Sequence, residues 1–280
     1  MNDTPAAPAP EGPHCSITEH DGIITVTVHR PRKLNAFSHE VTAAFWHAAN
    51  ELADRDDLRC MVITATGSKY FTAGLDLSQP GGNRPGNPDT QHQHPGWNFR
   101  RNYRSHHLLY DEFEAIEKPI IMAVDGICLG AGVEMAASCD FRFCTPRSEF
   151  RVPEVQLGAI AGSGGTSRLT RLIGPHWGKW MAMAAMPVGA DQAQHIGLVH
   201  AVYPEESFLD DVYAFCRHLM TIQAEALGLA KLTVDIYADV QDRTVQRHID
   251  RLAVWSTFPE FEKSMQRFGL KKDDPKADGS

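Results

Sequence analysis

The sequence predicts an α/β protein with a helical C-terminal part. Three observations predict this class: strand-like and helix-like segments alternate over about the first 175 residues, the pattern beyond them is mostly helical, and no stretch of the sequence repeats. A chain of 280 residues, 42% hydrophobic and 22% charged, is also long enough and apolar enough to bury a sizeable core.

The first predicted elements are two strands that flank a helix. Residues 22–30 (GIITVTVHR) alternate apolar and polar side chains, and residues 60–66 (CMVITAT) form an apolar run typical of a buried strand. Between them, residues 38–56 predict a helix with Ser38 as its N-cap. The apolar positions of this helix follow helical spacing: Val41, Ala44, Phe45, Ala48 and Leu52.

The alternation continues through the middle of the chain. A helix is expected from about residue 99 to residue 117, a strand over 119–126 and another strand over 140–145, with a glycine turn and a short helix around Glu134 between the two strands. Residues 150–174 predict a loop that feeds a further helix. This succession of strands and helices is what predicts the α/β class.

The domain organisation follows from composition. Residues 1–14, rich in Pro and Ala, predict a disordered tail, and residues 271–280 a charged one. Between the tails we expect a core over 15–205 and a helical C-terminal region over 206–270. Residues 78–98, rich in Gly, Pro, Asn and His, form a loop long enough to be either functional or disordered.

Charge and composition exclude several classes of protein. A net charge of -8 argues against a nucleic-acid or anionic-membrane surface, which would need a basic face. No apolar run reaches the roughly 18 residues of a membrane span, and the N-terminus has neither the basic nor the apolar region of a secretory signal. The six cysteines include no CxxC pair, which favours reduced, buried thiols in a cytoplasmic protein.

Standard motifs for nucleotide, metal and serine chemistry are absent. The sequence has no Walker A motif, no GxGxxG after a strand, no HExxH and no GxSxG, and the glycine spacing around Ser163 does not match a nucleophile elbow. His92, His94, His106 and His107 lie close in sequence, but the first two stand in a polar loop without acidic or thiol ligands at a characteristic spacing. We therefore expect no metal site.

Two small-residue loops predict backbone hydrogen-bond donors. Residues 69–77 (KYFTAGLDL) contain Ala73 and Gly74 after a strand, and Ala131 and Gly132 lie at a helix start, where N–H groups are unpaired and favour negative charge. Two such donors from separate loops are what an oxyanion hole requires. Glycine turns at helix starts are also common without any function, so either loop alone is a weak indication.

Two glutamates stand in apolar surroundings. Glu134 lies inside an apolar helix and Glu154 follows a proline in an apolar loop. Carboxylates are almost never fully buried without compensation. If the two met in one pocket, repulsion and desolvation would leave one acid and one base. Their spacing alone does not show that they meet.

Five motifs in order give the chain a family resemblance. They are HRPRKLNAFS, FTAGLDL, VDGICLGAGVEMAASCDFRF, FRVPEVQLGAIAGSGGTSRLTRLIG and ADQAQHIGLVHAVYP. From about residue 16 to residue 268 the sequence resembles the enoyl-CoA hydratase/isomerase family, also called the crotonase superfamily. The resemblance implies a spiral of ββα units, a homotrimer or a hexamer made of two trimers, and an acyl-CoA thioester as substrate. No cofactor is implied, because coenzyme A is part of the substrate.

The resemblance also implies roles for individual residues. Glu134 and Glu154 match the two catalytic glutamates of enoyl-CoA hydratases, with Glu134 as the base toward water and Glu154 as the proton donor to Cα. The backbone N–H groups of Ala73 and Ala131 match the two oxyanion donors. The residues that the resemblance places at the acyl-CoA site are Lys33, Leu34, Ala73, Gly74, Leu75, Asp76 and Ala131.

Two departures from the family pattern bear on the reaction. Many members have three glycines where this chain has Gly130, Ala131 and Gly132, but alanine still offers its N–H. Dienoyl-CoA isomerases carry an aspartate where this chain has Gly162, so a hydratase of 2-enoyl-CoA fits better. The alternatives are an enoyl-CoA or dienoyl-CoA isomerase and a C–C bond hydrolase acting on a bulky CoA thioester. An inactive CoA- or RNA-binding relative fits less well, because both glutamates are retained and the chain is acidic.

Overall fold

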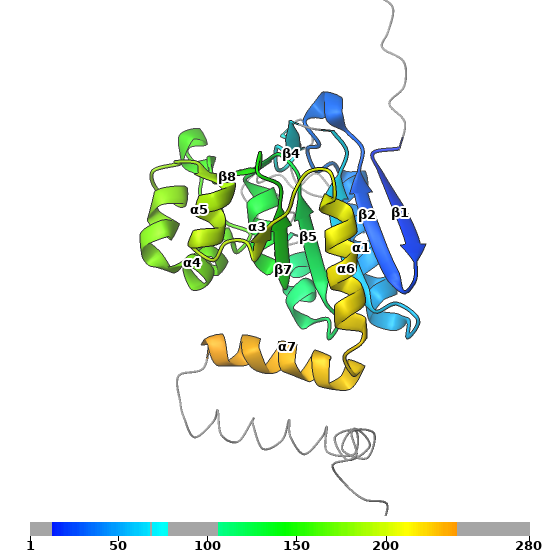
Figure 1. Ribbon diagram of the computed structural model, residues 1–280. Coiled ribbons are helices and arrows are strands. Elements are labelled where there is room, and N and C mark those ends of the chain that lie inside the picture. The colour runs from blue at the N-terminus through cyan, green and yellow to red at the C-terminus, as the bar shows by residue number, and fades with distance from the viewer. Residues whose placement is uncertain (1–12, 68, 78–105, 240–280) are drawn as a thin grey trace, which may run out of the picture.

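The structure, a computed structural model, describes residues 13–67, 69–77 and 106–239 and contains two β-sheets with helices around them (Figure 1). The six-stranded sheet has the order β1 (Cys15–His20), β2 (Ile23–Val28), β3 (Cys60–Ala65), β5 (Ile120–Val124), β7 (Phe141–Cys144) and β10 (Ala201–Val202). The four-stranded sheet has the order β4 (Tyr70–Thr72), β6 (Ile127–Leu129), β8 (Glu149–Arg151) and β9 (Val188–Gly189). Within them only the pairs β1–β2 and β8–β9 are antiparallel among the described strands.

Consecutive strands enter the two sheets in turn. β3, β5 and β7 join the large sheet, and each is followed directly by a strand of the small sheet, β4, β6 and β8. A helical segment comes after each pair: residues 106–115 (after the undescribed residues 78–105), α3 (Ala131–Ser138), and a short 3₁₀ turn, η2 (Glu154–Leu157), that leads to α4 (Gly165–Ala182). This repeated ββα order matches the spiral of ββα units that the resemblance implies, which confirms the predicted α/β class.

The remaining helices complete the layers. They are α1 (His39–Asp54), α5 (Ala190–His195), α6 (Phe208–Met220), α7 (Ala224–Asp239) and the 3₁₀ turn η1 (Pro31–Lys33). α1 begins where the sequence predicts, because the Ser38 hydroxyl accepts a hydrogen bond from the Val41 N–H at 3.3 Å. The predicted strands over 22–30, 60–66, 119–126 and 140–145 are confirmed as β2, β3, β5 and β7.

Both faces of the large sheet are buried. On one face Ile24, Val26 and Ile63 pack with Phe45 of α1 and with α3. On the other face a second apolar cluster joins strand residues to α6: Ile23, Val62, Ile121, Ala123, Phe143, Phe208, Val212, Cys216 and Leu219. Burial on both faces explains why β3 and β5 are continuous apolar runs. α6 therefore extends the core beyond residue 205, where the sequence analysis ended it.

α7 crosses below the sheet (Figure 1) and is held there by a buried lysine. Lys231 Nζ donates to the Phe113 carbonyl at 2.7 Å and lies 2.9 Å from Asp140 Oδ2. Close packing helps, because a Cβ at Gly228 would lie 2.8 Å from the Glu117 carbonyl oxygen. The helix is thus fixed to the end of the segment that begins at residue 106.

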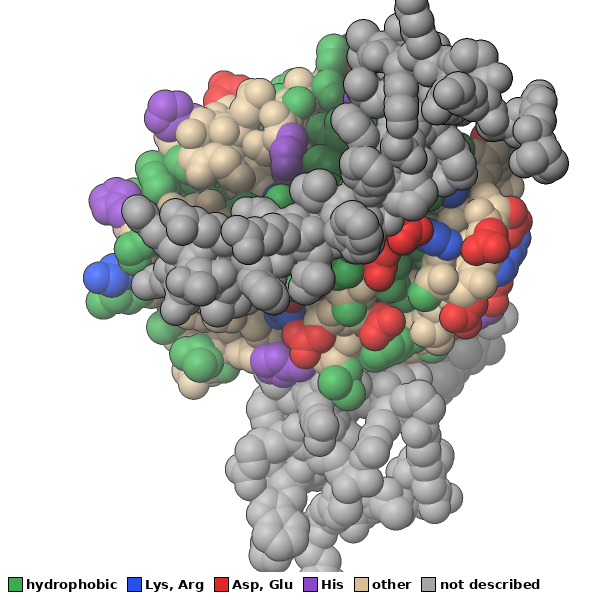
Figure 2. Space-filling model, turned by 90° about the horizontal axis from the view of Figure 1, so that it is seen from below, with side chains coloured by type: hydrophobic (Ala, Val, Ile, Leu, Met, Phe, Trp, Pro, Cys, Tyr) green, Lys and Arg blue, Asp and Glu red, His purple; other side chains and the backbone are tan. Residues whose placement is uncertain are grey.

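The described surface carries mixed charge. Seen from below, acidic, basic and apolar side chains are interspersed, with the acidic ones more prominent (Figure 2), in keeping with the net charge of -8. None of the helices in the described ranges is both long and apolar enough to span a membrane. All six cysteines are free thiols, and five of them are buried. The predicted tails and the loop over 78–98 lie outside the described residues, apart from positions 13 and 14.

Candidate active site

Glu134 is buried in the first turn of α3, which lies beside α4 (Figure 1). Its side chain is compensated by backbone donors: Oε1 accepts hydrogen bonds from the N–H groups of Ser163 at 2.8 Å and Gly165 at 3.2 Å. Burial is the largest influence on this carboxyl and the charge of Glu154 the second, and together they raise the pKa of Glu134 to about 7. The two N–H donors and Arg168 act against that rise. Glu134 can therefore exchange a proton near neutral pH.

Glu154 approaches the same region from η2. Pro153 precedes it, and its carboxylate lies against the backbone of Gly130, since a Cβ built on Gly130 would be 2.6 Å from Glu154 Oε1. Burial raises the pKa of Glu154, and its Oε2 is buried without a hydrogen-bond partner among the described residues. Because the charge of Glu154 also contributes to the raised pKa of Glu134, the two carboxyls lie close enough to interact, beside the start of α3.

Gly130 shapes this helix start. Its φ of 52° and ψ of -118° lie where only glycine is comfortable, and its missing Cβ leaves room for Glu154. No side chain caps the helix. The N–H of Ala131 has no acceptor within hydrogen-bonding range among the described residues, so it is an unpaired donor at a helix N-terminus.

The second donor is not the one predicted. The Ala73 N–H already donates to the Leu34 carbonyl at 2.9 Å, so the prediction that Ala73 supplies an oxyanion donor is wrong. The Gly74 N–H is taken by Thr72 Oγ1 at 3.1 Å. Leu75 is different: the Gly74 carbonyl and the Asp76 N–H on either side of it bond to the backbone of Phe37, and the described residues provide no acceptor for the Leu75 N–H.

Leu75 is next to Ala131 in space. A Cβ built on Gly74, the residue before Leu75, would lie 3.2 Å from the Ala131 nitrogen. This close approach and a φ of 85° make glycine necessary at position 74. The unpaired N–H groups of Leu75 and Ala131 therefore come from two loops that touch, which is the arrangement that a developing oxyanion needs.

The residues predicted at the acyl-CoA site divide into two groups. Lys33 and Leu34 are exposed, and they lie next to the 73–77 loop through the hydrogen bond between Ala73 and Leu34. Asp76 instead points inward and forms an ion pair with Arg30, with Nη1 and Oδ2 3.0 Å apart and both side chains buried. The Asp76 side chain therefore stabilises the loop.

Sequence reasoning missed the turn that holds Glu134. The turn consists of Ser163, Gly164 and Gly165, whose glycines were noticed only as a poor match to a nucleophile elbow. A Cβ on Gly165 would lie 2.5 Å from Glu134 Cγ, so a side chain there would displace the carboxylate. The signal was a run of small residues downstream of a predicted catalytic glutamate. Of the four histidines weighed as metal ligands, His92 and His94 lie outside the described residues.

Fold and site together define an α/β protein with a pair of carboxylates, one buried and one half-buried, beside two backbone donors that have no acceptor among the described residues. The model of one family, described as enoyl-CoA hydratase/isomerase, matches residues 18–277. The chain belongs to the enoyl-CoA hydratase/isomerase family.

The relatives of this chain are named for different activities. Crotonyl-CoA hydratase of Syntrophomonas wolfei subsp. wolfei is 30% identical over 258 residues, which cover 91% of this chain and 95% of that protein. The mitochondrial Delta(3,5)-Delta(2,4)-dienoyl-CoA isomerase of Rattus norvegicus is 29% identical over 90% of this chain and 77% of its own length. A crystal structure of an enoyl-CoA hydratase from Bacillus anthracis has a TM-score of 0.81 at 23% identity, covering 92% of this chain and 97% of that one.

Proposed function

We propose that this protein is an enoyl-CoA hydratase, which adds water across the 2,3 double bond of a 2-enoyl-CoA thioester. One observation carries the proposal: buried Glu134 and half-buried Glu154 converge at the N-terminus of α3, beside two unpaired N–H groups. The similarity to a crotonyl-CoA hydratase supports it. The substrate would enter past Lys33 and Leu34, with its thioester carbonyl facing Leu75 and Ala131.

The N–H groups of Leu75 and Ala131 would donate to the thioester oxygen. This polarises the conjugated system and makes Cβ electrophilic, and the donors stabilise the negative charge that develops on oxygen as water attacks. Both peptides are held in place, Leu75 by the pairing of its neighbours with Phe37 and Ala131 by the helix it begins. The oxyanion hole is therefore preorganised.

The two glutamates would handle the protons. A water between them attacks Cβ, forming the C–O bond, while Glu134 takes the proton that this water loses and the π electrons move to the thioester oxygen as an enolate. Glu154, protonated at that stage, then delivers its proton to Cα as the carbonyl re-forms. Two protons have moved, one onto Glu134 and one off Glu154, and exchange between the two carboxyls restores the starting state. The raised pKa values of both groups support this division: the pKa of Glu134 is about 7, and burial raises that of Glu154, which favours its protonated form.

A test follows from the chemistry of the double bond. Hydration removes the conjugated enoyl-thioester absorbance and adds the mass of one water, so both would be measured with crotonyl-, octenoyl- and cinnamoyl-CoA. Loss of absorbance with that mass gain supports the hydratase. The acyl group that reacts fastest then indicates the size of the acyl pocket. A product of unchanged mass from 3-enoyl- or 3,5-dienoyl-CoA would replace this proposal with an isomerase.

The isomerase is the second candidate because the same two carboxylates could move a proton between carbons. The similarity to a dienoyl-CoA isomerase favours it. Gly162 stands where such isomerases carry a further aspartate, and this counts against it. A C–C bond hydrolase on a bulky thioester would instead release two products, which the same mass measurement detects.

We also propose a homotrimer or a dimer of trimers. Val234 and Ile236 are exposed apolar residues on α7, 66% and 41% accessible, and such residues favour an interface. Light scattering should give three or six times the chain mass of 31.0 kDa. A monomer mass at micromolar concentration would contradict this.

A further inference from the structure

The N–H groups and the carbonyls of the turn over residues 163–165 have different partners. Its N–H groups from Ser163 and Gly165 point to Glu134, whereas the carbonyls of Ser163 and Gly164 face Arg168. The Ser163 carbonyl accepts from Arg168 Nη1 at 3.2 Å. The Gly164 carbonyl accepts from the Arg168 backbone N–H at 2.8 Å and from the Ser167 hydroxyl at 3.0 Å. The backbone bond belongs to the start of α4, so the link that depends on the Arg168 side chain runs through Ser163, whose carbonyl accepts from Nη1 and whose N–H holds Glu134. Such linked hydrogen bonds reinforce one another.

The guanidinium of Arg168 fits tightly against this turn. A Cβ built on Gly164, whose φ is 87°, would lie 1.9 Å from Arg168 Nη1, so only glycine leaves the space. On the opposite side, Gly165 leaves the space for Glu134. The turn is thus enclosed between the catalytic carboxylate and a cation, with no side chain of its own at either contact.

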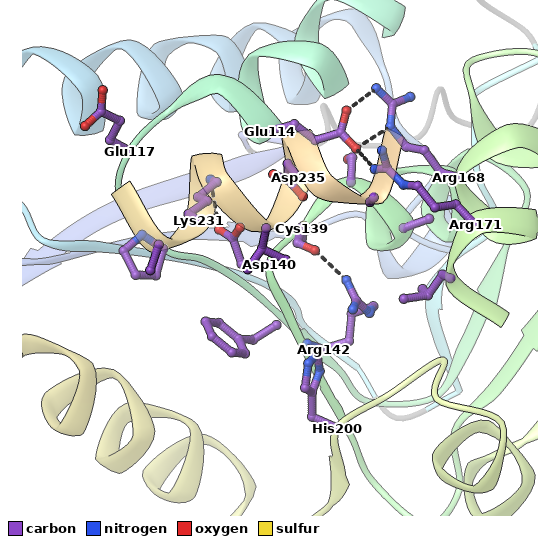
Figure 3. A pocket seen from close by; sticks show the side chains of 18 of the residues that line it. Glu114, Glu117, Cys139, Asp140, Arg142, Arg168, Arg171, His200, Lys231 and Asp235 are labelled. Carbon is purple, nitrogen blue, oxygen red and sulfur yellow. Dashed lines mark hydrogen bonds and ion pairs between the residues drawn. The ribbon is translucent and has the colours of Figure 1, made fainter. Parts of the chain in front are cut away.

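Arg168 is itself held by the helical segment over 106–115 (Figure 3). Glu114 binds it in a two-point arrangement, with Nε to Oε1 at 3.0 Å and Nη2 to Oε2 at 2.8 Å, and Asp111 Oδ1 accepts from Nη2 at 2.6 Å. The Arg168 side chain is only 8% exposed. Bidentate charge-assisted bonds of this kind fix both position and orientation.

We propose that Arg168 is a positioning residue for Glu134: it fixes the turn whose N–H groups hold the carboxylate, and Glu114 and Asp111 fix Arg168. This inference rests on the proposed function, because it assigns Glu134 the role of base. Arg168 also acts through its charge, which opposes the rise in the pKa of Glu134 caused by burial and by Glu154. The charged groups that face Glu134 are thus Glu154 from η2 and Arg168 from α4.

Arg171 provides a matched control. It lies on the same helix, its Nη2 donates to Glu114 Oε1 at 2.7 Å, and together with Arg168 it lines a cavity of about 520 Å³ (Figure 3). Its side chain is 32% exposed, and the turn over 163–165 is bound by Arg168 instead. Removing Arg171 therefore perturbs the ion-pair network without removing the link to Glu134.

The experiment compares R168Q, R168K and R171Q in the full-length protein. R168Q should lower kcat by about 10- to 100-fold, because small displacements of a catalytic group cost that much, with KM changed less than about threefold. The acid limb of the pH profile of kcat/KM should move up by about one unit in R168Q, since a favourable charge is lost. R168K should fall between R168Q and the wild type, and R171Q should match the wild type.

A readout without turnover separates this inference from the proposed function. Infrared titration of the Glu134 carboxyl, identified by its absence in E134Q, should show its midpoint raised in R168Q. If no substrate is hydrated but the midpoint rises, the hydratase proposal fails and the positioning role stands. If hydration depends on Glu134 while R168Q titrates and turns over as the wild type does, the positioning role fails alone. A loss of kcat in R171Q equal to that in R168Q also overturns the positioning role. If R168Q does not fold, R168K replaces it, and wild-type turnover and a wild-type titration midpoint in R168K overturn the role.

Discussion

Glu134, within α3, and Asp140, just beyond its end, are two buried carboxylates that are compensated in opposite ways. Asp140 Oδ2 lies 2.9 Å from Lys231 Nζ and accepts from the Ile120 N–H at 2.7 Å. Glu134 accepts two backbone N–H bonds and faces another carboxylate, Glu154. Burial raises the pKa of both, but Lys231 pulls that of Asp140 back down, whereas Glu154 pushes that of Glu134 further up.

The difference separates a structural carboxylate from one that can do chemistry. A directly bound cation, Lys231, opposes the rise in the pKa of Asp140, and the pair connects β5, β7 and α7. Neutral dipoles hold Glu134 in place without fixing its charge, so it can gain and lose a proton near neutral pH. Position in the sequence does not distinguish the two, since both stand at the same apolar helix.

The largest expected effect is on turnover. E134Q should lower kcat by about 100- to 10,000-fold, the range for loss of a general base, because the amide keeps the shape but cannot accept the proton from water. D140N is the matched control and should keep kcat within about threefold. Steady-state kinetics on the preferred enoyl-CoA checks this, and wild-type turnover in E134Q would remove Glu134 from the mechanism.

The opposite pattern is expected for folding stability. D140N should lower the free energy of unfolding by about 3 kcal/mol, because it leaves the Lys231 ammonium buried without its counter-ion. Urea unfolding measures this, and the double variant D140N/K231M should recover part of the loss. An unchanged unfolding midpoint in D140N would mean that the Asp140–Lys231 pair adds nothing to stability, so Asp140 could not be called a structural carboxylate.

Much of the fold was predictable from local sequence, but the second sheet was not. β2, β3, β5 and β7 are strands of four to six residues in which apolar side chains alternate with polar ones or run continuously, and α1 carries its own cap signal. β4, β6 and β8 have three residues each and depend on partners far along the chain. Short strands of this kind carry too little periodicity to be recognised before their pairing is known.

The site divides in the same way. Glu134 and Glu154 were predictable because a carboxylate in an apolar segment is unusual in any context. The prediction for Ala73 was wrong because its N–H is already bonded to the carbonyl of Leu34. A local sequence motif does not reveal such a tertiary acceptor. The roles of Gly165 and Arg168 also depend on tertiary contacts, so the downstream turn went unrecognised.

The pH dependence of stability sharpens the comparison further. The pKa of Glu134 is raised from 4.5 to about 7 in the folded protein, so its contribution to stability is complete below pH 4.5 and is lost as the pH rises through 7. The loss amounts to roughly 3 kcal/mol at most. E134Q has no such titration and should therefore gain stability relative to the wild type between pH 5 and pH 8. Urea unfolding of both proteins at pH 5 and pH 8 checks this. If the difference in unfolding free energy between E134Q and the wild type is the same at both pH values, the pKa of Glu134 is not raised.

The smallest effect expected tests how closely the turn fits Glu134. G165A places a methyl group 2.5 Å from Glu134 Cγ, and the carboxylate or the turn must move, so we expect kcat to fall by about 10-fold. Helix propensity acts in the other direction, because Gly165 begins α4 and alanine is the better helix former. Loss of turnover with stability retained would therefore point to displacement of the carboxylate.

Gly189 offers the control for this variant. It has an extended backbone with φ of -78° and no atom within 4 Å of an added Cβ, so G189A should leave turnover unchanged and stability within about 0.5 kcal/mol. If G165A behaves like G189A, the carboxylate tolerates movement and the fixed geometry of Glu134 is not needed for turnover. If only G165A loses activity, the backbone donors act by holding Glu134 in one position, in contrast to Asp140, where an ion pair does the holding.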